Sequence, residues 1–412
     1  MKVLLSAYAC EPDRGSEPAV GWNWAMEMAK YVDVVVLTRA NNEELISEKL
    51  QTYKEAGKKD LPTFLYHDPP WLCVTAKKKG VLPVQLFYIL WQIGAFFKVR
   101  RTLESYDIVH HVTFNSMMSP GFWWSKKTPT ILGPLGGSSI VRNDYKVLFG
   151  ARLRKELLRE WMIKHWEKLP WLRFSFSRSS MILCANSETQ SYIASKYPLK
   201  VRNFLETGIQ RESIAVPNNG ELSNSGIVRL IWVGSVEPWK ALSLGLRAYA
   251  KALSSLPEAR DIILDVVGTG SELSESKKEA ESLNLDGKVC FHGVLPLSET
   301  QELMKSSDVL LFTSVKDTSG NVVLEAMAQA KPVICLNHQG VKDMATEETA
   351  IKVAPGSIED TIDGLASAIM KLANDPQLRL QMGNEGRQRV LDVYSWEEKA
   401  KLMKDCYDKV LS

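Results

Sequence analysis

The chain has 412 residues, which is long for one hydrophobic core and suits two domains of about 200 residues each. With 45% hydrophobic and 24% charged residues, its composition is globular and excludes a disordered chain. The net charge of +3 is too small for binding nucleic acid over the whole surface, so we expect no nucleic-acid partner.

The cysteines and the N-terminus indicate the compartment. Six cysteines are spread along the chain without a close pair, which predicts free thiols in a reducing environment. The opening MKVLLSAYACEPDRG has too short an apolar run for a signal peptide, and acids follow at once. We therefore expect a first β-strand here and a cytoplasmic protein.

Short apolar runs alternate with helical patterns in both halves of the chain. In the first half we predict strands at 2–9, 32–38, 107–113 and 128–133, with a helix at 22–31. In the second half the runs at 228–235, 261–268, 288–293, 309–314, 331–336 and 350–355 predict strands. Apolar strands that alternate with helices are typical of parallel sheets covered on both faces, as in Rossmann-like domains.

A segment rich in Pro, Asn, Ser and Gly at 214–227 favours a hinge between two such domains. We divide the chain at this segment, into a first domain at 1–215 and a second at 216–394. The amphipathic C-terminal stretch at 395–412 is expected to cross back onto the first domain. In open parallel sheets ligands lie beyond the carboxyl ends of the strands, so we expect the ligand in a cleft between the domains.

The stretch DTSGNVVLEAMAQAKPVIC at 317–335 reads as loop, helix and strand, with Asp317 and Glu325 eight positions apart. A helix that begins near Ser319 or Gly320 offers unpaired N–H groups to an anion. A sugar, a phosphate and a ribose in series would suit the two acids. Alternatively, Asp317 caps the turn and Glu325 pairs with a lysine. The residues alone leave both interpretations open.

This stretch resembles the signature of family 4 retaining glycosyltransferases of the GT-B fold, which have two Rossmann-like domains facing across a cleft. The signature has two acids eight apart, a Gly-containing loop and a small-residue helix. Asp317 departs from the usual Glu by one methylene group. The resemblance implies that the first domain binds the acceptor and the second binds the nucleotide sugar. It places the donor sugar and pyrophosphate at Asp317, Ser319, Gly320, Asn321 and Val322, and the ribose at Glu325.

Four further loops complete the donor site that the resemblance implies. The stretch WVGSVEPWKAL matches the family's phosphate loop at Lys240, while Ser235 stands where the family has an arginine. A cation is needed there because the resemblance implies a site without metal or other cofactor. Gly15 and Ser16, in CEPDRGSEPAVGW, would pass the donor phosphate. Gly268 would allow the nucleotide to pack closely, and the backbone at Val294 would bracket the base.

The stretch YDIVHHVTFNSMMSP resembles the family strand that ends in a histidine at the donor sugar. His110 and His111 point to opposite faces of a strand, and we assign His111 to the sugar. With Asp317 and Lys240 it makes up the expected catalytic set. The acceptor side is assigned to His110, Thr113, Asn115, Gly136 and Gly137.

Two stretches of the first half favour a membrane surface. Residues 81–97 carry no charge and lie between KKK and KVRR, and 151–178 mixes Trp, Leu and basic residues. We expect these stretches to lie in the interface of the inner leaflet, where a lipid-linked acceptor would be found. The alternatives are a buried helix with solvated flanks and, for 81–97, a short span that Pro83, Gln85 and Gln92 weaken.

The sequence therefore predicts a retaining, metal-independent hexosyltransferase. It would move a sugar from a nucleotide-diphosphate donor to a hydroxyl of an acceptor glycan or lipid-linked glycan, in polysaccharide, lipopolysaccharide or glycolipid assembly. It would be cytoplasmic and peripheral on the inner membrane face. The alternatives are a nucleotide-sugar epimerase of the same fold and a non-catalytic membrane-associated scaffold. A dehydrogenase is disfavoured because DVVGTGSEL lacks the third glycine of a dinucleotide fingerprint.

Overall fold

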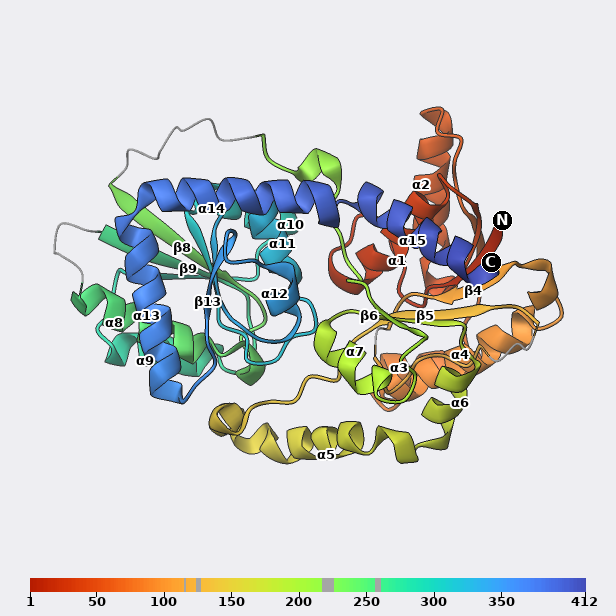
Figure 1. Cartoon of the computed structure of the whole chain (residues 1–412), viewed down its shortest axis with the longest axis horizontal. Helices are drawn as coiled ribbons and strands as arrows, with labels where there is room; N and C mark the ends of the chain where they lie inside the picture. The colour runs from red at the N-terminus through yellow and green to blue at the C-terminus, as the bar shows by residue number, and fades with distance from the viewer. Residues whose placement is uncertain (115, 124–126, 217–225, 256–260) are drawn as a thin grey trace. The chain divides into compact units, whose positions relative to one another are not determined.

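A computed structural model describes residues 1–114, 116–123, 127–216, 226–255 and 261–412. It divides into two compact units, each with a parallel sheet covered by helices (Figure 1). Unit 1 contains Met1–Ser138, Met162–Gly208 and Trp396–Ser412, and unit 2 contains Ser139–Trp161 and Ile209–Ser395. This division differs from the expected one because 139–161 and 209–215 belong to unit 2, where Val141, Tyr145 and Phe149 join the core.

The sheet of unit 1 has seven strands in the order β3-β2-β1-β4-β5-β6-β7, and all its strand pairs are parallel. The four apolar runs predicted in the first half form β1, β2, β4 and β5, and β1, β4 and β6 are almost wholly buried. The strands are β1 (Lys2–Ser6), β2 (Asp33–Thr38), β3 (Thr63–Tyr66), β4 (Ile108–His111), β5 (Thr130–Leu135), β6 (Met181–Cys184) and β7 (Val201–Asn203).

The helices of unit 1 connect these strands, and the C-terminal helix packs on the first one (Figure 1). They are α1 (Ser16–Met28), α2 (Glu43–Glu55), α3 (Trp71–Lys78), α4 (Val84–Val99), α6 (Pro170–Arg178), α7 (Ser187–Ala194) and α15 (Trp396–Leu411). Trp24 of α1 meets Trp396 of α15 edge to face, with ring centroids 5.1 Å apart. Trp396, Met403 and Tyr407 are buried in the same apolar cluster as α1.

The sheet of unit 2 has six parallel strands in the order β10-β9-β8-β11-β12-β13. Each of the six runs predicted in the second half forms one of them. The strands are β8 (Ile227–Val233), β9 (Asp261–Val267), β10 (Val289–Gly293), β11 (Val309–Phe312), β12 (Val333–Leu336) and β13 (Ala350–Val353). Both units therefore have the predicted Rossmann-like architecture.

Helices cover both faces of this second sheet (Figure 1). A 3₁₀ segment at Asn143–Arg152 precedes α5 (Leu153–Lys164), the first nine residues of which belong to unit 2. The others are α8 (Leu242–Ser255), α9 (Leu273–Ser282), α10 (Leu297–Ser306), α11 (Asn321–Ala328), α12 (Gln339–Met344), α13 (Ile358–Asn374) and α14 (Pro376–Arg389). Ser357 and Asp360 form a capping box that fixes the start of α13.

No helix among the described residues is long and apolar enough to cross a membrane. The uncharged stretch at 81–97 falls largely within α4, and one face of that helix is buried in the core. Phe87, Tyr88, Trp91 and Ala95 have no exposed surface, whereas Ile93 and Phe97 are exposed.

Candidate functional site

The strand order of unit 2 reverses between β8 and β11. From β8 the chain continues to β9 and β10 on one side, and β11 leads to β12 and β13 on the other. The loops that leave the carboxyl ends of β8 and β11 therefore open next to each other. In open parallel sheets this reversal point is where ligands bind.

Lys240 and Asp317 meet at this point. Lys240 ends the loop after β8, Asp317 lies in the loop after β11, and the ammonium group of Lys240 forms an ion pair with the Asp317 carboxylate. Each side chain keeps 19% of its surface exposed, so the pair remains accessible to a ligand. The Lys240 ammonium also lies 5.5 Å from the centre of the Phe312 ring. The structure therefore brings together two of the three predicted catalytic residues.

The backbones of the two loops are joined by hydrogen bonds. The N–H groups of Val315 and Lys316 donate to the carbonyl of Trp239 at 2.8 and 3.2 Å. The hydroxyl of Thr313 donates to the carbonyl of Lys240 at 2.8 Å. These bonds fix the position of Lys240 relative to Asp317, and they do not depend on the ion pair itself.

The loop after β11 turns at Gly320 into the start of α11. Gly320 has φ +69°, and a Cβ atom there would lie 3.0 Å from the Phe312 ring, so glycine is favoured on both counts. Ser319 donates to the side chain of Asn321 at 3.2 Å. Asp317 is held through its own N–H, which donates to Gln339 at 2.5 Å. The predicted residues from Asp317 to Val322 thus surround a helix N-terminus, which favours an anion.

Three other predicted donor residues follow adjacent strands and lie at the same edge of the sheet. Ser235 follows β8, Gly268 follows β9 and Val294 follows β10. Ser235 is exposed and the side chain of Val294 is 72% exposed. A Cβ at Gly268 would lie 1.8 Å from the carbonyl oxygen of Gly234, and its φ is +135°. Only glycine fits this close approach of the β8 and β9 loops.

Glu325 occupies a different kind of position in α11. Burial raises the pKa of its carboxyl group, and the structure records no hydrogen bond or ion pair for its side chain. It lines a small pocket with Thr300, Met304 and Gln329, and neither Lys240 nor Asp317 is part of that pocket. The lysine partner considered for Glu325 is therefore not observed among the described residues.

The two histidines of unit 1 are both buried, and both are fully bonded inside that unit. His110 bonds the Tyr407 hydroxyl at 2.7 Å and the Gly133 carbonyl at 2.8 Å. His111 bonds the Tyr88 hydroxyl at 2.6 Å and Ser6 at 3.1 Å. Burial lowers their pKa values, to about 4 for His110 and to about 3 for His111, so both are neutral at pH 7. This geometry favours structural roles for the two rings, and the assignment of His111 to a donor sugar stays a prediction.

The remaining unit 1 residues lie near the carboxyl ends of β1, β4 and β5. Gly15 and Ser16 are exposed at the start of α1. Thr113 is fully buried and accepts from the N–H of Ala9 at 3.2 Å. Gly136 pairs with Ser116 beyond β5, followed by Gly137 at φ +81°. Asn115 lies outside the described residues. The acceptor roles of these residues stay predictions.

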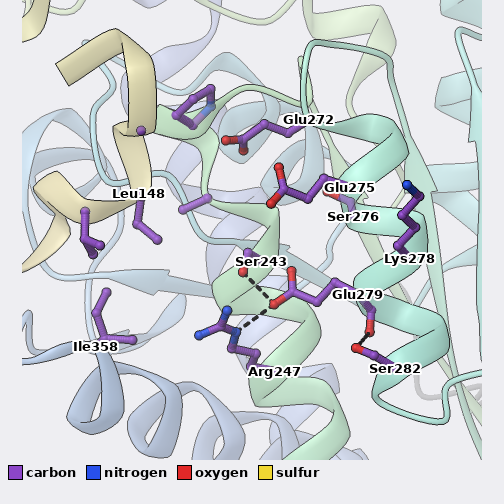
Figure 2. Close-up of a pocket in the computed structure, with 14 residues that line it drawn as sticks. Leu148, Ser243, Arg247, Glu272, Glu275, Ser276, Lys278, Glu279, Ser282 and Ile358 are labelled. Carbon is purple, nitrogen blue, oxygen red and sulfur yellow. Dashed lines mark hydrogen bonds and ion pairs between the residues drawn. The ribbon is translucent and has the colours of Figure 1, made fainter. Parts of the chain in front are cut away.

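A pocket of about 640 Å³ lies elsewhere in unit 2, between residues 147–150, α8 and α9 (Figure 2). Figure 2 shows Leu148 and Ile358 on one side of it and the acids Glu275 and Glu279 on the other. Burial and the charges of Glu275 and Glu237 raise the pKa of Glu272, also in the lining, to about 7. None of the predicted donor residues lines this pocket, so it is not the predicted donor site.

Several residues that support the site were missed from the sequence. Lys316 precedes Asp317 and forms an ion pair with Glu156 of α5 at 2.6 Å, and Arg152 forms one with Glu237. The pattern of Trp, Leu and basic residues at 151–178 predicts a membrane surface and not these ion pairs. The recurrence of Glu and Arg at helical spacing in LRKELLREW was the available signal.

The family comparison matches the part of the chain that carries this site. Residues 220–389 match the family model described as glycosyl transferases group 1. The matched residues lie within unit 2, and the match bears out the resemblance to glycosyltransferases that the signature indicated. Membership of the retaining family 4 stays a prediction.

Curated relatives match over part of their length. The chain is 29% identical to D-inositol 3-phosphate glycosyltransferase of Kribbella flavida over 41% of this chain and 40% of the relative. It is 29% identical to the lipopolysaccharide core biosynthesis glycosyltransferase LpsE of Rhizobium meliloti (37% and 43%). It is 25% identical to alpha-monoglucosyldiacylglycerol synthase of Streptococcus pneumoniae (59% and 54%). The chain thus spans less than two thirds of each of these relatives.

Solved structures match the whole chain in fold. Anabaena Alr3699/HepE, solved in complex with UDP, aligns with a TM-score of 0.63 at 14% identity and covers 99% of this chain and 100% of its own. WaaG, a glycosyltransferase involved in lipopolysaccharide biosynthesis, aligns with a TM-score of 0.61 at 19% identity (97% and 99%). These likenesses confirm the predicted GT-B fold of two Rossmann-like domains.

Proposed function

We propose that the chain is a retaining glycosyltransferase that moves a sugar from a nucleotide-diphosphate donor to an acceptor hydroxyl. The observation that carries this proposal is the accessible pair of Lys240 and Asp317 at the strand reversal of unit 2, beside the N-terminus of α11. It lies within the region that matches the glycosyl transferases group 1 model.

The chemistry of such a site follows from where charge develops. When the bond between the sugar and the diphosphate breaks, negative charge grows on the departing phosphate oxygens. Lys240 and the N–H groups at the start of α11 would stabilise that charge, while Asp317 would orient the cation and accept a hydrogen bond from a sugar hydroxyl. In a retaining reaction at one face of the sugar, the leaving diphosphate assists the incoming hydroxyl. No carboxylate pair of the glycosidase type is then needed.

Protein charge takes the place of a metal ion in this proposal. Among the residues the structure describes, no group of three or more His, Cys, Asp or Glu side chains is placed to hold a metal. Ser235 stands where the resemblance expects an arginine, which leaves Lys240 as the cation of its loop. We propose that Ser235 hydrogen-bonds the phosphate and that Glu325, a partly buried acid for which the structure shows no partner among its described residues, accepts hydrogen bonds from the ribose.

The acceptor class is proposed from the relatives and from the surface of unit 1. Relatives are named for lipopolysaccharide core biosynthesis and for a glucosyldiacylglycerol synthase, which supports a polysaccharide, lipopolysaccharide or glycolipid acceptor. Trp71 and Leu72 on α3 and Phe97 on α4 are 72%, 62% and 56% exposed. Lysines and arginines accompany them at 77–79 and 98–101. We propose that this face lies on the inner leaflet, in the cytoplasm, where a lipid-linked acceptor would be reached.

A thermal-shift screen of nucleoside diphosphates and nucleotide sugars tests the proposal. A ligand that binds only the folded state adds to the free energy of unfolding, by about 2.7 kcal/mol at a ligand concentration 100 times its Kd. The melting temperature rises as a result. We expect at least one nucleoside diphosphate to raise the Tm. We also expect the protein to glycosylate a lipid when the matching nucleotide sugar is mixed with an extract that contains acceptor lipids. The absence of any shift with uridine, guanosine and adenosine diphosphates would contradict the proposal.

A further inference from the structure

The segment 139–161 comes from the first half of the chain but belongs to unit 2. We call it the bracing segment. Val141, Tyr145 and Phe149 are buried in the apolar core of unit 2, and the Tyr145 hydroxyl hydrogen-bonds Thr361 at 2.9 Å. A segment anchored in this way is a fixed part of the unit, so its other side chains can hold neighbouring loops in place.

The bracing segment holds the loop after β11 through Lys316. Glu156 is 6% exposed and binds the Lys316 ammonium at 2.6 Å, while Arg159 binds the same carboxylate. Burial raises the pKa of Glu156, but the bonds from Arg159 and Lys316 outweigh it and keep the pKa below its ordinary value. In addition, Ser139 donates to the backbone carbonyl of Asp317 at 3.4 Å. The neighbour of Asp317 and Asp317 itself are therefore both tied to this segment.

The same segment holds the loop after β8. Arg152 forms an ion pair with Glu237, and its guanidinium carbon lies 5.5 Å from the ring centre of Trp239, the residue before Lys240. The Lys316 ammonium also lies 5.5 Å from the Trp239 ring and 5.4 Å from that of Phe149. Lys316 thus contacts a ring of the β8 loop and a ring of the bracing segment.

We propose that the bracing segment positions the donor site, with Glu156 and Arg152 acting as positioning residues for the Asp317 and Lys240 loops. This inference rests on the proposed function. A ligand contact is not assigned to either residue. They act by fixing Lys316 and the Glu237–Trp239 stretch, and through them Lys240, which binds the diphosphate, and Asp317, which orients Lys240 and the donor sugar. Loss of such support displaces binding groups by fractions of an ångström, which is enough to change rates.

The chain offers a matched control for Glu156 on the same helix. Glu160 is 3% exposed and binds Lys146 at 2.9 Å, and Lys146 is 20% exposed, as Lys316 is. The two acids are therefore alike in burial and each binds a lysine, but Glu156 also binds Arg159, and one carboxylate oxygen of Glu160 has no hydrogen-bond partner in the part of the chain that the structure describes. Among the described residues, Glu156 is the one of the two acids that forms an ion pair with a residue of the donor loops, while the charge of Glu160 acts on Lys316 without such a pair and raises its pKa.

The experiment compares Glu156→Gln with Glu160→Gln in the full chain. The probe is the nucleoside diphosphate that most raises the Tm of the wild type, and its Kd is measured by calorimetry together with kcat and KM of the matching nucleotide sugar. We expect Glu156→Gln to lower the Tm more than Glu160→Gln, because Glu156 has two ion pairs and Glu160 has one. Glu156→Gln should lower kcat/KM for the donor by roughly 10- to 100-fold, whereas Glu160→Gln should change it less than about twofold. KM for the acceptor should not change in either.

A second variant covers the case in which Glu156→Gln fails to fold. Arg152 is 43% exposed, so Arg152→Gln should fold and should weaken binding of the same diphosphate by about threefold to tenfold. Equal effects of Glu156→Gln and Glu160→Gln on donor kcat/KM, or wild-type binding in Arg152→Gln, would overturn the inference while the proposed function stands. A wild type that binds no nucleoside diphosphate would instead remove the proposed function, and this inference with it.

Discussion

At the scale of single residues, the site depends on which charges have partners. Lys240 and Asp317 neutralise each other, whereas Glu325 is largely buried without a recorded partner, and burial raises the pKa of its carboxyl group. An unpaired acid in such a place costs stability when ionised, because water no longer solvates it. A ligand that supplied the missing hydrogen bonds would offset this cost.

Glu325→Gln tests this trade between stability and binding. A folded pKa above the unfolded value means that ionisation of Glu325 destabilises the fold as the pH rises through that pKa. The neutral amide removes this cost, so we expect a higher Tm at pH 7, by about 2–4 °C for each kcal/mol gained. The same variant should bind nucleoside diphosphates more weakly. A lower Tm, or unchanged affinity in calorimetry, would contradict the role given to Glu325.

The sequence could predict Lys240 and Asp317 because each follows an apolar strand within a recognisable loop. It could not predict the environment of His110 and His111. Their partners, Tyr407 and Tyr88, lie 297 and 23 positions away in sequence. Nothing in the strand pattern shows that these hydroxyls reach the two rings.

At the scale of elements, the donor loops require close backbone approaches. The β8 and β9 loops touch at Gly268, where a side chain would overlap the Gly234 carbonyl. Gly15, by contrast, has φ −90°, and no atom within 4 Å would meet a Cβ there.

We therefore expect Gly268→Ala to cost at least about 1–3 kcal/mol of unfolding free energy and to abolish diphosphate binding. Gly15→Ala should leave the stability unchanged within about 0.5 kcal/mol. Urea unfolding of both variants measures these changes in the free energy of unfolding. A Gly268→Ala protein that is as stable as the wild type and still binds the diphosphate would contradict the close approach of the β8 and β9 loops.

The C-terminal helix α15 contributes a pH-dependent element to unit 1. Lys399 is 3% exposed, donates to the Leu205 carbonyl, and lies 4.4 Å from the ring centre of Phe204. Burial lowers its pKa from 10.5 to about 7, and the charge of Glu206 offsets only part of this. Between these values the unfolded chain holds a proton that the folded chain lacks, so stability rises with pH.

The stability should therefore increase from about pH 7 toward pH 10, with a contribution from Lys399 of up to about 1.4 kcal/mol per pH unit. Lys399→Met should remove this contribution and be relatively more stable than the wild type near pH 6. Melting curves of the wild type and Lys399→Met between about pH 6 and pH 10 test whether Lys399 makes this contribution. Parallel pH profiles would show that Lys399 does not titrate in this window.

The strands of unit 2 could be predicted from the sequence, but the placement of the bracing segment in unit 2 could not. Apolar runs bounded by Gly, Pro and Ser indicate all six strands of unit 2, because buried parallel strands need continuous apolar sequence. The bracing segment escaped prediction since Glu156 and Lys316 are 160 positions apart, and long-range ion pairs leave no local pattern.

At the scale of the whole molecule, we propose a donor site in unit 2 and a membrane-facing surface in unit 1. Exposed Trp71 and Phe97 beside basic residues favour an interface with anionic lipid. We expect the protein to sediment with vesicles that contain phosphatidylglycerol, and less so as the salt concentration rises.

Replacing Trp71 and Phe97 with Ser should reduce sedimentation several-fold at low salt. Leu199→Ser is the control, because Leu199 is 97% exposed and lies outside α3 and α4. Equal binding of wild type and double variant, or equal losses in the control, would exclude α3 and α4 as the membrane-facing surface.

The central claim is that Lys240 binds the diphosphate of a nucleotide donor beside Asp317. Calorimetric titration of the full chain with UDP and GDP, for the wild type, Lys240→Ala and Lys251→Ala, tests it most directly. Lys251 is the control because it also pairs with an aspartate of the same unit, Asp363, but outside the loops after β8 and β11. We predict that Lys240→Ala weakens binding of the tighter diphosphate by about 10- to 100-fold and that Lys251→Ala leaves it unchanged. Equal affinity in all three proteins, or no binding by the wild type, would contradict the account.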